Sequence, residues 1–145
     1  MCALVLIVLG GAFIHLWLAA GRRDSQPGIV AYKHKDYNKA ISELSMYIGH
    51  HPDHSEVALY YRGLSHLKLR QYNLAVQDLQ AYSQSAQGDS EAHYSLGQAL
   101  FEDGDLRGAR KQFTAAISWE SENRWKDQNL ISRSAAMIER IDKLR

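Results

Sequence analysis

The hydrophobic and polar residues divide the chain at Gly21. Residues 1–21 contain no lysine, arginine, aspartate or glutamate, whereas all 17 basic and all 16 acidic residues follow Gly21. As a helix, the run from Ala3 to Ala20 would rise about 27 Å, close to the thickness of a bilayer's hydrocarbon core. Trp17 lies near the end of this run, where an indole is favoured at the membrane interface. The pattern predicts a transmembrane anchor at residues 1–21.

The residues that flank the apolar run predict its orientation. Arg22 and Arg23 follow it directly, and no lysine or arginine precedes it. By the positive-inside rule, the rest of this single-pass membrane protein is expected on the cytoplasmic or equivalent side, with membrane lipid around residues 3–20. A cleavable signal peptide is the alternative, because the small residues of "LAAG" resemble a cleavage site, but the missing positive start disfavours it.

After residue 24, one set of residues recurs at intervals of 35 and then 34. The aligned segments are "GIVAYKHKDYNKAISELSMYI" from Gly28, "GLSHLKLRQYNLAVQDLQAYS" from Gly63 and "GQALFEDGDLRGARKQFTAAI" from Gly97. Besides the glycines, three more positions match in each segment: Tyr37, Tyr72 and Leu106; Ala40, Ala75 and Ala109; Leu44, Leu79 and Phe113. We interpret the small residues as helix crossings, since a larger side chain would hold the two backbones apart. The large residues then continue a buried stripe.

This repeat resembles the tetratricopeptide repeat, a helix–turn–helix unit of about 34 residues. The resemblance covers about residues 22–54, 56–88 and 90–123. It implies an all-α fold, in which three helix pairs stack into an α-solenoid behind the membrane helix. No such unit buries its apolar face alone, so the last unit needs a lid.

The C-terminal segment, residues 126–145, has the pattern of that lid. Apolar residues recur there at helical spacing, namely Leu130, Met137, Ile141 and Leu144. The charged residues between them are expected in solvent, namely Arg133, Glu139, Arg140 and Lys143. The segment therefore predicts an amphipathic capping helix.

Charge balance and motifs restrict the class of function. A net charge of +1 without a clustered basic excess disfavours a nucleic-acid-binding protein. The single cysteine, Cys2, excludes an internal disulfide and a cysteine zinc cluster. The motifs GxSxG, HExxH, GxGxxG and GxxxxGKS/T are absent. We therefore expect no enzymatic activity, no cofactor and no small-molecule substrate.

Four potential metal ligands stand together in "YIGHHPDHSEV": His50, His51, Asp53 and His54. A metal site is one interpretation, but structural zinc usually has four ligands held on a framework. In the repeat register this stretch joins the first two units. Gly49 would end a helix, Pro52 would prevent its continuation, and Asp53 or Ser55 would cap the next helix. A solvated loop is the favoured interpretation, and a partner-contact loop is a further alternative.

The family resemblance implies that the first helix of each unit lines a concave groove. The residues that this register turns toward the groove are Ile29, Tyr32, Lys33, Tyr60, Tyr61, Leu64, Lys68, Tyr94, Gln98 and Glu102. Tyrosines supply large contact area at low entropic cost, so we expect a partly apolar protein segment, extended or helical, as the ligand. The alternative is that several of these tyrosines only pack between repeats.

One known use of the groove in this family is a clamp of lysine, asparagine and arginine for the two carboxylates at a chaperone's C-terminus. The positions that would carry the clamp are Ser25, Ile29, Tyr61, Glu91 and Ser95. None matches, so capture of a chaperone by such a clamp is disfavoured.

Together these features predict a membrane-anchored adaptor or scaffold that holds another protein in its groove for complex assembly or recruitment. Two alternatives stay open. One is a structural accessory subunit of a large membrane protein complex, and the other is a secreted or periplasmic repeat protein whose apolar segment is removed.

The anchor generates the first prediction. The chain should sediment with membranes and resist extraction by carbonate or high salt, because burial and not charge holds an apolar span. Replacing Arg22 and Arg23 by acidic residues should weaken the preferred orientation. Fractionation and immunoblotting check the first point, and protease protection checks the second. Recovery of the chain in the soluble fraction with residues 1–20 still attached would contradict the anchor.

Overall fold

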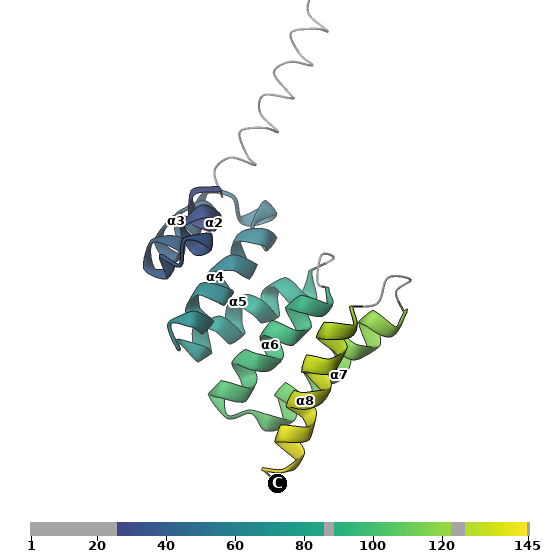
Figure 1. Cartoon of the computed structure of the whole chain (residues 1–145). Helices are drawn as coiled ribbons and strands as arrows, with labels where there is room; N and C mark the ends of the chain where they lie inside the picture. Colours follow the sequence, from purple (N-terminus) through teal and green to yellow (C-terminus); the bar gives the residue numbers. More distant parts are fainter. Residues whose placement is uncertain (1–25, 86–88, 123–126, 145) are drawn as a thin grey trace, which may run out of the picture.

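The computed structural model describes residues 26–85, 89–122 and 127–144, which together form an all-α solenoid (Figure 1). The predicted anchor at residues 1–21 lies outside these residues. Three antiparallel pairs follow one another and a last helix closes the row: α2 (Gln26–Lys33) with α3 (Tyr37–His50), α4 (Glu56–Lys68) with α5 (Tyr72–Gln84), α6 (Ser90–Asp103) with α7 (Leu106–Glu122), and α8 (Gln128–Asp142). A single 3₁₀ turn, η1 (Pro52–His54), precedes α4.

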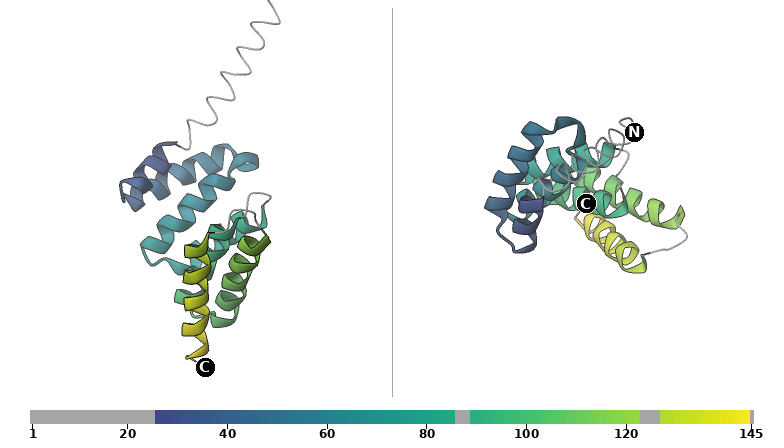
Figure 2. Two further views of the ribbon diagram at one scale, coloured as in Figure 1. Left: turned by 45° about the vertical axis from the view of Figure 1, so that its right-hand side comes forward. Right: turned by 90° about the horizontal axis from the view of Figure 1, so that it is seen from above.

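The pairs stack in chain order, and α8 lies against the last pair in both views of Figure 2. It contacts α7 and also α6. The predicted all-α solenoid is therefore confirmed. In the ranges that the structure describes, no helix is both long and apolar enough to cross a bilayer.

Each helix pair crosses where a glycine of the first helix meets a large apolar side chain of the second. A Cβ atom built on Gly28 would lie 2.5 Å from Cγ of Leu44, and one on Gly63 would lie 2.8 Å from Cγ of Leu79. The same construction on Gly97 meets Cε1 of Phe113 at 2.8 Å. The repeat alanines beside these contacts are fully buried: Ala40, Ala75 and Ala109. The predicted crossing residues are thus confirmed, and only glycine fits at this separation of the backbones.

The turn inside each pair has one recurring geometry. The residue in the left-handed region is Lys35 (φ 63°) in the first pair, Arg70 (φ 59°) in the second and Gly104 (φ 94°) in the third. The amide of the next residue then donates to a carbonyl in the last turn of the preceding helix, as Gln71 does to His66 at 2.9 Å. Glycine is favoured in this left-handed conformation. Lys35 and Arg70 adopt it although they carry a side chain, which makes the conformation less favourable for them than for Gly104.

A buried carboxylate fixes the start of α8. Glu120, near the end of α7, accepts a hydrogen bond from the hydroxyl of Ser90 at the start of α6 and another from the amide of Asp127 at 2.8 Å. Asp127 is the N-cap of α8, and its side chain accepts from the amides of Asn129 and Leu130 at 2.8 and 3.1 Å. One side chain therefore holds α8 against both helices of the last pair.

The face that α8 buries differs in part from the predicted stripe. Leu130 and Ile141 are buried in the core as predicted, and Ser134 is buried between them. Leu144 is 60% exposed, because α8 ends at Asp142 and Leu144 lies beyond it. The expectation that Leu144 packs inward was wrong.

The crossings generate a stability prediction. Gly63→Leu and Ala75→Leu should each lower the free energy of unfolding by roughly 1–3 kcal/mol or more, because they overpack the second helix pair. Urea unfolding followed by circular dichroism measures the change. Gly49→Ala is the control, since a Cβ there has no neighbour within 4 Å. It should stabilise α3 by about 0.5–1 kcal/mol. Unchanged unfolding in both leucine variants would mean that the crossings lie elsewhere.

Candidate peptide-binding groove

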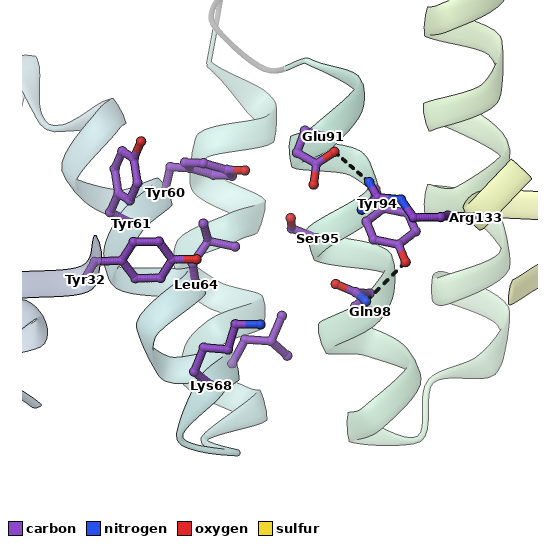
Figure 3. A pocket seen from close by; sticks show the side chains of 11 residues that line it. Tyr32, Tyr60, Tyr61, Leu64, Lys68, Glu91, Tyr94, Ser95, Gln98 and Arg133 are labelled. Carbon is purple, nitrogen blue, oxygen red and sulfur yellow. Dashed lines mark hydrogen bonds and ion pairs between the residues drawn. The ribbon is translucent and has the colours of Figure 1, made fainter. Parts of the chain in front are cut away.

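A hollow of about 410 Å³ lies on the face formed by the first helices of the pairs and by α8 (Figure 3). We call it the aromatic groove and define it by its lining: Tyr32, Tyr60, Tyr61, Leu64, Leu67, Lys68, Glu91, Tyr94, Ser95, Gln98 and Arg133. The rings from α2 and α4 stand on one side in Figure 3, and the side chains from α6 and α8 stand on the other. The stacking of the pairs is what brings these helices to one face.

Three half-buried tyrosines form a continuous wall. The ring centroids of Tyr32 and Tyr61 are 5.3 Å apart, and those of Tyr61 and Tyr60 are 5.5 Å apart, both in edge-to-face arrangements. Burial raises the pKa of Tyr32 and of Tyr60 above the ordinary tyrosine value. Both phenols therefore stay neutral at physiological pH. The wall is apolar with hydroxyl tips, which suits contact with a mixed apolar and polar segment.

Tyr94 is different, because it belongs mainly to the core. Its residue surface is only 8% exposed, and its ring packs 5.5 Å from that of Phe113. The amide of Gln98 donates to its hydroxyl at 3.3 Å, and the guanidinium of Arg133 lies 4.4 Å from its centroid. For this tyrosine, packing is the main role, and only part of the ring reaches the groove.

Seven of the ten residues predicted for the groove do line it: Tyr32, Tyr60, Tyr61, Leu64, Lys68, Tyr94 and Gln98. The other three do not. Ile29 packs against the core of the first pair, and Lys33 is exposed at the end of α2. Glu102 lies in a second, adjoining hollow.

Arg133 is exposed, as predicted, and it also lines the aromatic groove, which was not predicted. It forms an ion pair with Glu91 at 2.9 Å while it covers the ring of Tyr94. The available signal was the spacing of Arg133, Met137 and Arg140, which places all three on one stripe of α8. The prediction of α8 as a capping helix accounted only for its buried face, and it did not include this stripe of three residues in the groove.

The second hollow continues the first one and has a volume of about 400 Å³. We call it the basic hollow, and its lining is Leu67, Lys68, Arg70, Tyr72, Gln98, Phe101, Glu102, Met137 and Arg140. Leu67, Lys68 and Gln98 line both hollows, so the two form one continuous surface. Arg140 is exposed, as predicted, and its guanidinium also lies 4.8 Å from the ring centroid of Phe101.

Residues 60–125 match a family model described as "Tetratricopeptide repeat". The chain has the tetratricopeptide-repeat fold. None of the curated protein sequences compared with it is significantly similar.

Several solved tetratricopeptide-repeat structures resemble the array at low sequence identity. The TPR domain of Arabidopsis OM64 superposes with a TM-score of 0.72 at 22% identity, over 86% of this chain and 96% of that one. The second TPR domain of human RPAP3, solved in complex with an HSP70 peptide, gives 0.69 at 18% identity over 86% and 97%. PcrH, in complex with the chaperone binding region of PopD, gives 0.73 at 18% identity over 84% and 90%.

The histidine-rich stretch of the tetratricopeptide-repeat array lies away from both hollows, in the connection between its first two units. His51 caps α3, which continues through Gly49 to His50, so the expectation that Gly49 ends this helix was wrong. Of the two predicted caps of α4, Asp53 and Ser55, Ser55 occupies the N-cap position, but its hydroxyl donates to the carbonyl of Pro52 at 3.0 Å and caps no amide of the helix. Across residues 26–85, 89–122 and 127–144, no three histidine, cysteine, aspartate or glutamate side chains are grouped so that they could hold a metal ion.

The burial of Tyr94 generates a prediction. Tyr94→Ala should lower the free energy of unfolding by about 3 kcal/mol or more, as for other large aromatic deletions in a core. Tyr94→Phe should cost much less, because it keeps the packing on Phe113 and loses only the hydroxyl. Chemical unfolding of the two variants side by side measures the difference. An equal, small cost for both would mean that the ring is not part of the core.

Proposed function

We propose that this chain is a membrane-anchored adaptor whose aromatic groove binds a partly apolar segment of another protein, for recruitment or complex assembly. The proposal rests chiefly on one observation, the row of Tyr32, Tyr61 and Tyr60 along a hollow large enough for several side chains. Rigid aromatic rings lose little conformational entropy on binding, and protein interfaces are enriched in them.

The fold neighbours support a protein ligand. The RPAP3 domain holds a peptide of HSP70, and PcrH holds a region of PopD. Protein–protein interaction is thus a recurrent use of this fold. By analogy, we assign a protein segment and not a small molecule to the groove of this chain.

The charges near the start of α6 argue against a carboxylate clamp in this chain. Glu91 occupies one of the clamp positions, and its carboxylate is already paired with Arg133. Ser95, at another of these positions, is buried. The start of α6 therefore offers a chain terminus with two carboxylates no unpaired cation, and the proposed ligand enters this part of the groove with apolar and neutral side chains.

The rest of the proposal concerns location and activity. An anchor at residues 1–21, followed directly by two arginines, would hold the array at the cytoplasmic or equivalent face of a membrane. The adaptor needs no catalytic step, because its work is to raise the local concentration of the bound protein at that surface.

A blocking substitution tests this function. Gln98→Trp should obstruct the aromatic groove from its α6 side, because Gln98 is half-buried and lines both hollows. With a photoreactive benzoylphenylalanine at Tyr61, the full chain in its native membrane should crosslink to a defined partner. Gln98→Trp should reduce that product about tenfold or more, since loss of an interface hot spot costs 2 kcal/mol or more.

Gln77→Trp is the matched control, because Gln77 is an exposed glutamine of α5 that lines neither hollow. It should leave the crosslink unchanged, and both variants should keep their circular dichroism spectra. An undiminished crosslink in Gln98→Trp, or an equal loss in the two variants, would contradict the groove as the binding site.

A further inference from the structure

The basic hollow has an excess of positive charge that the chain itself does not neutralise. Lys68 at the end of α4, Arg70 in the turn that follows and Arg140 on α8 line it, and Glu102 is its one acidic lining residue. Three other arginines are paired: Arg62 with Asp78 at 2.7 Å, Arg110 with Asp142 at 3.1 Å and Arg133 with Glu91 at 2.9 Å. In the described part of the chain, neither Lys68, Arg70 nor Arg140 forms an ion pair. These three cations are therefore available to an external anion.

One of the three cations, Arg140, is held in place in a way that favours binding. Arg140 lies over Phe101, so its guanidinium is held by the ring while its N–H edges remain available to a carboxylate. Arg70 stands at the left-handed position of the turn between α4 and α5, with φ 59°. The third pair has Gly104 at the matching position. Lys35 has the same conformation in the first pair and lines neither hollow, so it is the position of Arg70 in the basic hollow, and not its backbone conformation, that assigns its side chain to this site.

The basic hollow is also the direct continuation of the aromatic groove. A segment that covers Tyr61 and Leu64 and then runs along α4 reaches Lys68 on the same helix. From Lys68, the lining residues Phe101 and Met137 supply apolar contacts for the stems of long side chains. The surface therefore changes from neutral and aromatic to basic along its length.

We propose that the basic hollow is a subsite for acidic side chains that flank the apolar part of the segment bound in the aromatic groove. This inference rests on the proposed function and adds the charge pattern of the ligand to it. Carboxylates of a protein fit the site better than the phosphates of a nucleic acid. The hollow contains Glu102 among its cations, and the whole chain carries a net charge of only +1.

The opposing interpretation is that these cations only complement the carboxyl ends of α4 and α8, where positive charge is favoured. It predicts a loss of stability on their removal and no change in ligand binding. For Arg70 the two interpretations separate clearly. Arg70→Gly removes the charge and also relieves the backbone strain, so the variant should be at least as stable as the original chain while it binds the acidic ligand less tightly.

The test uses the full chain in a mild detergent and two fluorescein-labelled synthetic peptides. Both peptides share a central Leu-Phe-Leu block, which is flanked on each side by three glutamates in one peptide and by three glutamines in the other. Flanks on both sides make the result independent of the direction in which the segment binds. Fluorescence polarisation should show that the glutamate peptide binds about tenfold more tightly than the glutamine peptide. This difference in affinity should decrease as salt is added.

Arg70→Gly should weaken the glutamate peptide about three- to fivefold and leave the glutamine peptide unchanged. Lys35→Gly is its matched control. Lys35 has the same backbone conformation (φ 63°) in the preceding pair and loses the same charge, but it lines neither hollow. Arg140→Gln should act in the same direction as Arg70→Gly, and Lys35→Gly should have no effect on either peptide.

Each of the remaining outcomes of the peptide experiment would contradict a specific part of the proposal. Equal binding of the two peptides would overturn the acidic subsite and leave the aromatic groove in place. Binding of the glutamate peptide alone, lost in Arg70→Gly, would overturn the groove and keep the basic hollow. Binding of neither peptide would overturn both. A single-stranded oligonucleotide that binds more tightly than the glutamate peptide, and loses this binding in Arg70→Gly, would replace the carboxylate ligand by phosphate.

Discussion

Close contact between a helical glycine and a large apolar side chain determines the geometry of this array. The contact occurs at Gly28 with Leu44, at Gly63 with Leu79 and at Gly97 with Phe113, and in each case a Cβ would lie within 2.8 Å of the opposing side chain. Because all three pairs cross at equivalent positions of the repeat, their first helices line the same side of the array. That common face is the reason that tyrosines more than thirty residues apart in the sequence, such as Tyr32 and Tyr94, line one hollow.

The residues that recur in every unit are also the ones that could be predicted from the sequence. Small and large residues at fixed spacing identified the crossings, and Tyr37, Tyr72 and Leu106 are indeed the first residues of α3, α5 and α7. The groove residues on α4 and α6 followed from the same register, since a position on one first helix predicts its equivalents on the others. The tyrosine wall could be expected for this reason, although only the structure distinguishes the half-buried Tyr61 from the core residue Tyr94.

Features that occur once could not be predicted in that way. No repeat position corresponds to α8, and its periodicity is the same whether its arginines face solvent or lie over the rings of Tyr94 and Phe101. The orientation of the helix is decided by tertiary contacts, above all by the buried carboxylate of Glu120, which accepts from Ser90 and from the backbone of Asp127. Likewise, the left-handed conformation of Lys35 and Arg70 departs from the residue preference of the turn, so composition gave no sign of it.

The position of α8 gives the last helix two roles that are thermodynamically linked. In a stacked array, an inner unit is stabilised by two neighbours and an end unit by one, so order is lost most readily from the ends. Here the end helix is also a wall of the site, through Arg133 in the aromatic groove and through Met137 and Arg140 in the basic hollow. A segment seated along these residues supplies the second neighbour that α8 lacks. Occupancy of the proposed site would therefore stabilise the C-terminal end of the array, and fraying of that end would lower the affinity by the same free energy.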